Sequence, residues 1–334
     1  MPLQCLQIGA RREPIKMTDN RRCCARLGAA MAMGMTLLIG TDMLADAAEN
    51  GMSVYPKGFA GFMSGVLPPQ PALYSNDYFY HFGGTASREV RDGAVETGAD
   101  IGVNFGFLSE TYVTDLRFFD AQYAFAGLFG WGNASITATA SAPIGTASIS
   151  AANNSLSDSF IAPVILGWHD GPFNWTFAAN VYVPTGTYNL RRLNIGTNVW
   201  GFVPQFAATY FDKETGWDVS GSLSLVVTAE NEATHYRSGD MLQLDWAAGK
   251  HFGAGGAWEG GIAGNVVYQV SGDSGAGARL GAFEERSVGI GPAISYATKL
   301  GAVPVSLSAK WERDVFTQNT FGGDVVTASA TFVL

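Results

Sequence analysis

Cysteine is nearly absent from this chain of 334 residues, and charged residues are scarce. The three cysteines are Cys5, Cys23 and Cys24, so the rest of the chain has no disulfide framework, thiolate metal site or cysteine nucleophile. Lys, Arg, Asp and Glu together make up 15% of the residues, and the net charge is −9. Because no basic stripe is available to neutralise phosphates, we expect no nucleic-acid partner.

Long apolar runs are missing as well. After residue 47, no uninterrupted apolar run approaches the about 18 residues that a membrane-spanning helix needs. This excludes a protein with several membrane-spanning helices. The low charge and the 12% of aromatic residues also argue against a disordered chain. With 42 glycines and 47% hydrophobic residues, two classes remain, a soluble β-sandwich and a membrane β-barrel.

Motifs of enzymatic chemistry are also lacking. The sequence contains no G-x-S-x-G elbow, no H-E-x-x-H motif and no P-loop. Its four histidines are far apart in the sequence: His81, His169, His235 and His251. Without a recognisable pair of nucleophile and base, we predict a protein that is not an enzyme and that needs no cofactor or metal ion.

The N-terminus has the three parts of a secretory signal peptide. Arginines between residues 21 and 26 are followed by an apolar stretch over 27–40 and by the A-x-A sequence Ala45-Asp46-Ala47. The apolar stretch is too short for an anchoring helix, so we predict a cleaved signal peptide over 1–47. Because such peptides usually have about 15–30 residues, Met17 is an alternative to Met1 as the true start.

Apolar and polar residues alternate in much of the remaining chain. From Trp217 to Glu230 the odd positions are apolar or glycine and the even positions are mostly polar, which predicts a strand with one apolar face. The same pattern recurs over 173–183, 258–270 and 305–312. Such runs exceed the about 5–6 residues of soluble strands and suit the roughly 9–11 of membrane strands. We therefore predict an all-β fold, a transmembrane antiparallel β-barrel with an apolar outer band and a polar lumen.

Short and long connections alternate between these strands. Short turns are predicted at 130–132, 170–172, 212–216, 252–256 and 301–303. Longer loops are predicted at 145–157, 185–199, 230–240, 271–285 and 314–322. Outer-membrane barrels have tight periplasmic turns and longer outer loops. Counting back from the C-terminus gives about twelve strands, the first near 97–112, and a strand-like run at 77–88 belongs either to a plug or to an extra pair that would make fourteen.

Aromatic residues mark the ends of the predicted strands. A periplasmic girdle beside the short turns is predicted from five residues: Trp131, Trp168, Trp175, Trp217 and Trp258. In the last strand, alternate positions from Val326 to Leu334 form an apolar face. Such an ending is similar to the C-terminal signal that outer-membrane barrels present to the barrel-assembly machinery, which we expect as a partner.

Polar residues with inward parity are candidates for lining the lumen. They are Asn174, Asn180, Asp218, Glu230, Asp245, Glu259, Asn265, Gln269, Lys310 and Glu312. Interior polar residues of barrels commonly hold water or one another, so a role in selectivity is the alternative to a structural role.

The segment 163–240 carries motifs that strand periodicity does not require. It contains VPTGTYNLRRLNIGTNVWGFVPQF at 183–206 and ENEATHYRSGD at 230–240. Over most of 54–334 the chain resembles the outer-membrane family named for the meta-pathway of phenol degradation, which includes SphA-like proteins. This resemblance implies a transmembrane barrel that handles hydrophobic or aromatic small molecules, and sphingosine is one of the molecules handled by relatives. It implies no catalytic residues.

The same loops supply candidates for contact with a substrate. They are Tyr188, Arg191, Arg192, Asn194, Asn198, Trp200, Tyr236, Arg237 and Asp240. Arg191 and Arg192 suit lipopolysaccharide phosphates or a substrate head group, and a solvated loop is the alternative. Arg237 and Asp240 are three residues apart and are placed to form an ion pair within their loop.

Together these features predict a Gram-negative outer-membrane protein in three parts. They are a signal peptide at 1–47, a plug or hatch at 48–95 and a barrel at 96–334. We expect contacts with outer-membrane lipid and lipopolysaccharide, and passive uptake of a hydrophobic small molecule such as a phenol, a hydrocarbon or a sphingoid-type lipid. A narrow general porin and a structural barrel without transport are the alternatives.

Overall fold

The computed structural model describes residues 53–90, 95–142, 145–279 and 281–334. The predicted signal peptide and residues 48–52 lie outside this part of the chain. Within the described residues, no helix is long and apolar enough to cross a membrane. The strands are β1 (Ala72–Val90), β2 (Val95–Phe118), β3 (Ala121–Ala142), β4 (Gly145–Leu156), β5 (Ser159–Asp170), β6 (Phe173–Val183), β7 (Gly201–Asp212), β8 (Trp217–Thr228), β9 (Met241–Phe252), β10 (Trp258–Gln269), β11 (Arg286–Leu300), β12 (Val303–Gln318) and β13 (Gly322–Val333).

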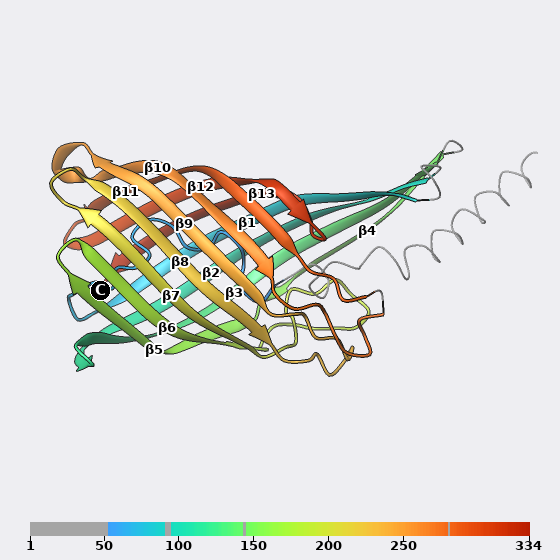
Figure 1. Cartoon of the computed structure of the whole chain (residues 1–334), viewed down its shortest axis with the longest axis horizontal. Coiled ribbons are helices and arrows are strands. Elements are labelled where there is room, and N and C mark those ends of the chain that lie inside the picture. The colour runs from blue at the N-terminus through green and yellow to red at the C-terminus, as the bar shows by residue number, and fades with distance from the viewer. Residues whose placement is uncertain (1–52, 91–94, 143–144, 280) are drawn as a thin grey trace, which may run out of the picture.

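All of the thirteen strands except β4 form a closed antiparallel barrel (Figure 1). The ring is closed by β1 and β13, which pair from Tyr74 opposite Val333 to Thr85 opposite Gly322. β4 pairs with the outer half of β3, and the other half of β3 pairs with β5. The predicted fold class, a barrel of twelve strands rather than fourteen, is confirmed.

Short turns gather at one end of the barrel and longer loops at the other, as predicted. We call these the turn end and the loop end. The predicted turns at 170–172, 212–216, 252–256 and 301–303 join neighbouring strands at the turn end, where the C-terminus also lies. The loop-end connections include the long ones predicted at 185–199, 230–240 and 271–285. The loop predicted at 314–322 is shorter, because β12 continues to Gln318.

The N-terminal boundary of the barrel is earlier than predicted. The first barrel strand, β1, begins at Ala72 and includes the run at 77–88. The predicted boundary between a plug over 48–95 and a barrel from 96 is therefore wrong, because residues 72–90 belong to the barrel. The expected pattern of apolar residues outside and polar residues inside fails in β1, because its aromatic residues face the lumen and its outward positions include Ser75 and Asp77. Tyr80 faces the lumen and is buried, whereas Phe79 points outward and is 45% exposed.

Two further predictions near the N-terminus are wrong. The turn predicted at 130–132 lies inside β3, because its glycines make room for aromatic rings rather than for a turn. A Cβ atom on Gly132 would lie 2.6 Å from the ring of Phe105 on β2. The loop predicted at 145–157 is mostly β4, whose Ser, Ala and Asn residues are exposed on both faces and therefore show no apolar period.

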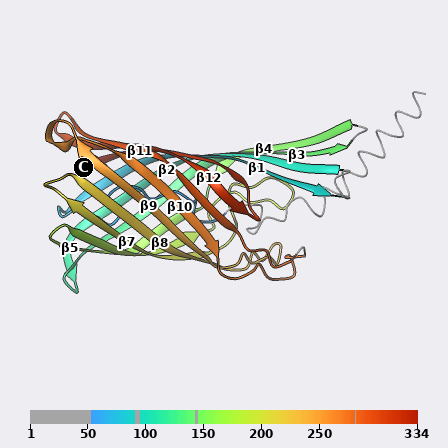
Figure 2. The same cartoon turned by 45° about the horizontal axis from the view of Figure 1, so that its top comes forward.

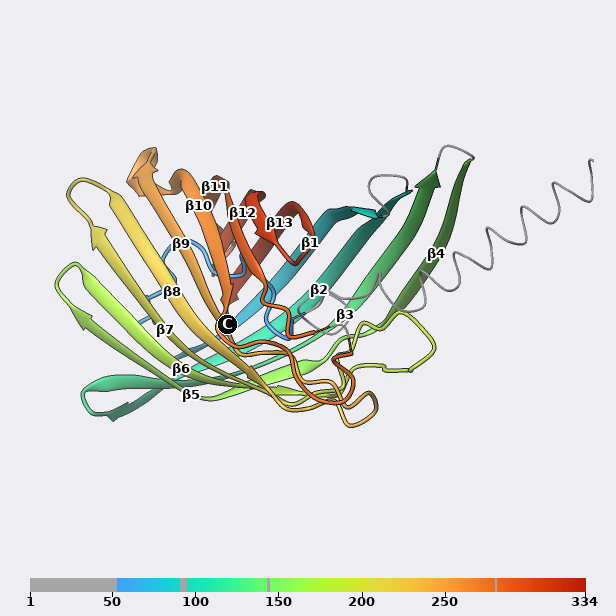
Figure 3. The same ribbon diagram turned by 45° about the vertical axis from the view of Figure 1, so that its right-hand side comes forward.

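β1 to β4 rise far above the rest of the wall at the loop end (Figures 2 and 3). β2 has 24 residues and β3 has 22, against 12 in β8. At about 3.3 Å per residue, the additional length is on the order of 40 Å along the strands. We call this four-stranded sheet, formed by the hairpins β1–β2 and β3–β4, the outer extension.

The outward face of the barrel is apolar and the inward face is polar in the strands where the sequence alternates. In β8, Val219 is 53% exposed whereas Asp218 is fully buried, and the alternation continues to Thr228. Trp168, Trp175 and Trp217 lie beside the turns of the turn end, as predicted for a girdle, and Trp258 does so too. Trp131 does not, because it lies on the outward face in the middle of β3.

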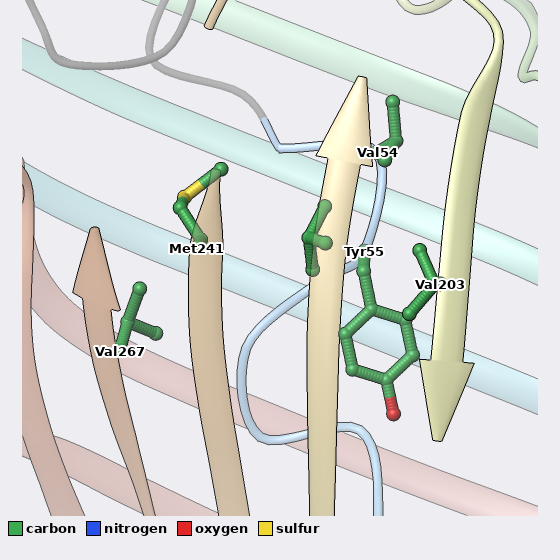
Figure 4. Close-up of a cluster of buried hydrophobic side chains, with 6 residues drawn as sticks. Val54, Tyr55, Val203, Met241 and Val267 are labelled. Carbon is green, nitrogen blue, oxygen red and sulfur yellow. The ribbon is translucent and has the colours of Figure 1, made fainter. Parts of the chain in front are cut away.

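Residues 53–71 run through the lumen from the loop end to the turn end, and we call them the inner segment. At the loop end, Val54 and Tyr55 pack in a buried apolar cluster with Val203, Met241 and Val267 (Figure 4). Near the turn end, the Gln122 side chain donates a hydrogen bond to the Pro69 carbonyl at 3.1 Å. The chain then enters β1 directly.

A candidate passage through the barrel

The backbone of the inner segment is bound to polar side chains of the barrel wall. The carboxylate of Asp245 on β9 accepts hydrogen bonds from the amides of Gly58 at 3.1 Å and Ala60 at 3.0 Å. Lower in the lumen, Thr209 Oγ1 on β7 accepts one from the Gly65 amide at 2.9 Å. These bonds satisfy amides that lack a strand partner, so the inner segment keeps a defined path although it has no regular structure.

Two lysines add charged contacts to this attachment. Lys57 of the inner segment pairs with Asp314 on β12 at 2.7 Å, and both side chains are almost buried. Lys310 on β12 donates to the carbonyl of Ala60 and also pairs with Glu312 at 3.0 Å. Since a buried charge without a partner is costly, these pairs hold the inner segment against the β9–β12 side of the lumen.

Close packing fixes the apolar side chains of the inner segment on the same side. The ring of Phe62 lies against Gly249 on β9, where an added Cβ would be 2.6 Å from a ring carbon. Phe62 also packs on a buried cluster made of Ala247, Ala263 and Ala293. Small residues of the wall thus provide the space into which this side chain fits.

The opposite wall is aromatic. Its inward-facing rings come from β1, β2, β5 and β6, and they are Tyr78, Tyr80, Phe82, Phe105, Phe107, Phe160 and Tyr182. Phe105 and Phe107 are stacked with centroids 5.2 Å apart, and Phe160 and Tyr182 are stacked at 5.5 Å. The lumen therefore has a polar side, which holds the inner segment, and an aromatic side.

Three of the larger cavities among the described residues lie along the inner segment. The loop-end cavity, of about 120 Å³, is lined chiefly by Tyr80, Phe82, Ile101, Val103, Phe105 and Phe107. The mid-barrel cavity, of about 360 Å³, lies among Phe59, Tyr78, Phe160 and Tyr182. The turn-end cavity, of about 450 Å³, includes Leu67, Trp168 and Trp175 with Arg117 and Lys213. An apolar cavity of roughly 150 Å³ can bind benzene, so the loop-end cavity is of a size suited to a single ring.

Outer loops fold over the loop-end cavity. Asp158, between β4 and β5, accepts hydrogen bonds from the amides of Gly186 at 2.9 Å and Thr197 at 2.7 Å. Ile195, which lies with Gly186 and Thr197 in the loop between β6 and β7, is 3% exposed and packs against Ile101 and its neighbours on the inward face of β2. These loops therefore cover part of the opening at the loop end and line the loop-end cavity together with the aromatic wall.

The predicted outer-loop residues connect the loops with one another. Asn194 bonds with Asn189, Asn198 donates to Asn231, and Asn231 donates to the hydroxyl of Tyr188. Tyr236 donates to Asp273, and Arg237 pairs with Asp240 at 2.9 Å. Arg191, Arg192 and Trp200 are exposed. Because the loop-end cavity is lined by other residues, their contact with a substrate stays a prediction.

Most of the predicted lumen residues face inward. Eight of them are buried: Asn180, Asp218, Asp245, Glu259, Asn265, Gln269, Lys310 and Glu312. Asn180 also points inward and donates to the Val203 carbonyl, and Asn174 lines the turn-end cavity. Glu230 is the exception, because β8 ends at Thr228 and the chain turns into a loop where Glu230 contacts His235.

The aromatic wall was missed in the sequence. Its residues occur where alternation is lost, as in the run from Tyr78 to Phe82, in which every side chain is aromatic or histidine. Aromatic residues at the alternate, inward positions of β1 and β2, as at Tyr78, Tyr80 and Phe82, are the signal that this part of the wall borders an apolar space inside the barrel. In the described part of the chain, no group of His, Cys, Asp and Glu is arranged to hold a metal ion.

Comparison of the sequence with family models agrees with this geometry. The model of the family described as MetA-pathway of phenol degradation matches residues 83–330, and the chain belongs to this family. No curated protein matches the sequence. The resemblance expected from the loop motifs is therefore confirmed.

A solved structure shows the same architecture. An outer membrane channel from Pseudomonas putida aligns with a TM-score of 0.61 at 13% identity, over 84% of this chain and 100% of that one. A FadL homologue from Pseudomonas aeruginosa aligns at 0.38 and 8% identity, over 88% of this chain and 97% of that one. The transport unit of the autotransporter AIDA-I from Escherichia coli gives 0.38 and 9%, over 79% and 90%. The likeness in fold rests on the first of these, and the chain has the fold of an outer-membrane β-barrel.

Proposed function

We propose that the protein is a channel of the Gram-negative outer membrane that lets small hydrophobic or aromatic molecules pass without an energy source and without catalysis. The observation that carries this proposal is the loop-end cavity, whose lining is mostly aromatic and aliphatic with polar groups such as Lys57, Asp158 and Glu285 at its edge, and which has room for about one ring. A polar lumen lined throughout by charged residues would instead suit ions and sugars.

The three cavities define the order of passage. A molecule enters beside the outer loops, reaches the loop-end cavity, crosses the mid-barrel cavity along the aromatic wall and leaves past Leu67 and Trp168 into the turn-end cavity. The outward apolar face contacts lipid, and exposed Arg191 and Arg192 are placed to meet lipopolysaccharide phosphates at the loop end. In this proposal the inner segment acts as a plug that reduces the lumen to these cavities.

A narrow general porin is the second candidate. It is favoured by the buried polar side chains on β8 to β12, among them Asp218, Glu259 and Lys310. Small ions could move along that side if water filled the spaces between these groups. The two candidates differ in their solutes, because the first passes hydrophobic or aromatic molecules and the second passes small ions.

Uptake measurements in cells test the proposal. A strain without the gene is supplied with the wild-type chain, with Val103→Trp, which fills the loop-end cavity, or with Val219→Trp, a matched change on the lipid-facing side of β8. We expect uptake of labelled phenol, hydrocarbon or long-chain base to fall without the gene and with Val103→Trp, and to be normal with Val219→Trp. Normal uptake of all three compounds in the deletion strain would exclude this function.

A further inference from the structure

The ring of Phe59 lies between the loop-end and mid-barrel cavities. It stacks on Tyr78 with centroids 4.7 Å apart and an interplanar angle of 19°. It also meets Tyr55 and Phe107 edge to face, at 6.0 Å and 6.2 Å. Phe107 lines the loop-end cavity, Phe59 and Tyr78 line the mid-barrel cavity, and Tyr55 lines both. A molecule that moves between these cavities must therefore pass this group of four rings.

The backbone on either side of this ring is held at several atoms. The Gly58 and Ala60 amides both bond to Asp245, and the Phe59 carbonyl accepts a hydrogen bond from the Tyr78 hydroxyl at 3.4 Å. Lys310 binds the next carbonyl, that of Ala60. Moving the inner segment as a hatch would break all of these bonds together, while turning the Phe59 side chain would break none of them.

We propose that Phe59 is the gate of this passage, that it opens by rotation of its side chain alone, and that it selects planar aromatic molecules over saturated rings of the same size. The reason for selection is that a passing ring takes the place of Phe59 against Tyr78 and Phe107. An aromatic solute restores the stacked and edge-to-face contacts that the rotation removes, and a saturated ring does not. This inference rests on the proposed channel function.

Phenol and cyclohexanol are a suitable pair of probes, because they differ in the ring and share the hydroxyl. Uptake of each labelled compound is measured in outer-membrane vesicles with and without the protein. The variants are Phe59→Leu, which keeps apolar bulk without a ring, and Phe59→Ala. The control is Phe177→Leu, the same change on the outward face of β6.

The wild type should take up phenol about two to ten times faster than cyclohexanol, since aromatic pairs gain a corresponding free energy over area alone. Phe59→Leu should bring the ratio close to one, Phe59→Ala should raise both rates, and Phe177→Leu should retain the wild-type ratio. An unchanged ratio in Phe59→Leu would overturn the gate. If the wild type takes up both compounds equally, the channel stands and the gate fails, and if it takes up neither, the channel itself fails.

A second measurement separates rotation of the ring from movement of the inner segment. Lys57→Cys and Asp314→Cys place two thiols where the native side chains meet, so that a short bifunctional reagent can tie the inner segment to β12. Phenol uptake should be the same before and after cross-linking. Loss of uptake in the cross-linked fraction would show that the whole segment moves and would overturn the proposal.

Discussion

At the scale of single residues, Asp245 makes two of the hydrogen bonds that hold the inner segment. Its carboxylate is almost fully buried and accepts two backbone hydrogen bonds on either side of Phe59. Hydrogen bonds to a charged group contribute about 1.5–3 kcal/mol each, so Asp245→Ala should loosen the segment without opening the barrel.

Hydrogen exchange of the Gly58 and Ala60 amides checks this prediction. Exchange should be faster in Asp245→Ala and unchanged in Asp324→Ala, which removes a more exposed carboxylate paired with Arg313. Equal protection in the two variants would mean that packing of Phe62 and its neighbours is sufficient to hold the segment.

The Lys57–Asp314 pair permits a second prediction for single residues. Lys57→Met leaves the carboxylate of Asp314, with 3% of its side chain exposed, without its cation. Such a loss costs about 3–5 kcal/mol, whereas replacing both partners by apolar residues costs less. Lys57→Met should therefore unfold at lower temperature than the double variant Lys57→Met/Asp314→Leu. The unfolding temperature is measured as the temperature at which the folded band on a gel is replaced by the unfolded band. A higher unfolding temperature for Lys57→Met than for the double variant would contradict the prediction.

At the scale of strands and loops, the sequence determined some elements well and others poorly. β8 and β10 were predicted correctly in extent and facing, because their two faces meet lipid and a polar lumen. β1 and β4 were not, because the aromatic residues of β1 face the lumen and β4 is exposed on both faces. The aromatic wall could not be predicted for the same reason, since it is the part of the lumen that is lined by rings rather than by polar side chains.

The outer loops should respond to pH through Asp273, which lies in the loop before β11. It is buried and accepts hydrogen bonds from Tyr236, Gly239 and Gln269. Burial raises its pKa above the usual value, although the three hydrogen bonds act in the opposite direction. A raised pKa in the folded state means that the stabilising contribution is complete below the ordinary Asp pKa and is lost as pH rises through the raised value.

Asp273→Asn removes this titration and tests its sign. As the pH rises from about 4 to 8, the melting temperature of the variant should increase relative to that of the wild type. The pKa of the neighbouring Glu285 is raised by burial and in part by the charge of Asp273, so the substitution also lowers the pKa of Glu285 and shifts the difference in the same direction. A difference that is independent of pH would contradict the prediction.

At the scale of the whole molecule, the boundary at Ala72 decides what a truncation does. Removing 53–71 takes out the inner segment and leaves all twelve strands of the ring, so we expect a folded barrel with a larger ionic current in planar bilayers. Removing 48–95 also deletes β1, so β13 keeps β12 but loses the partner that closes the ring. That truncation should give no heat-resistant folded band, and a folded product would show that β2 and β13 can close the ring without β1.

The direct passage from the inner segment into β1 also constrains the order of assembly. β1 and β13 are the first and last strands of the ring, and their pairing closes it. The inner segment is already tied at Pro69, only a few residues before β1 begins, and its other end reaches the loop end. Once the ring is complete, the segment could enter only by threading lengthwise between the bound side chains. The final seam must therefore form around a lumen that is already filled, so folding of the inner segment precedes closure of the barrel.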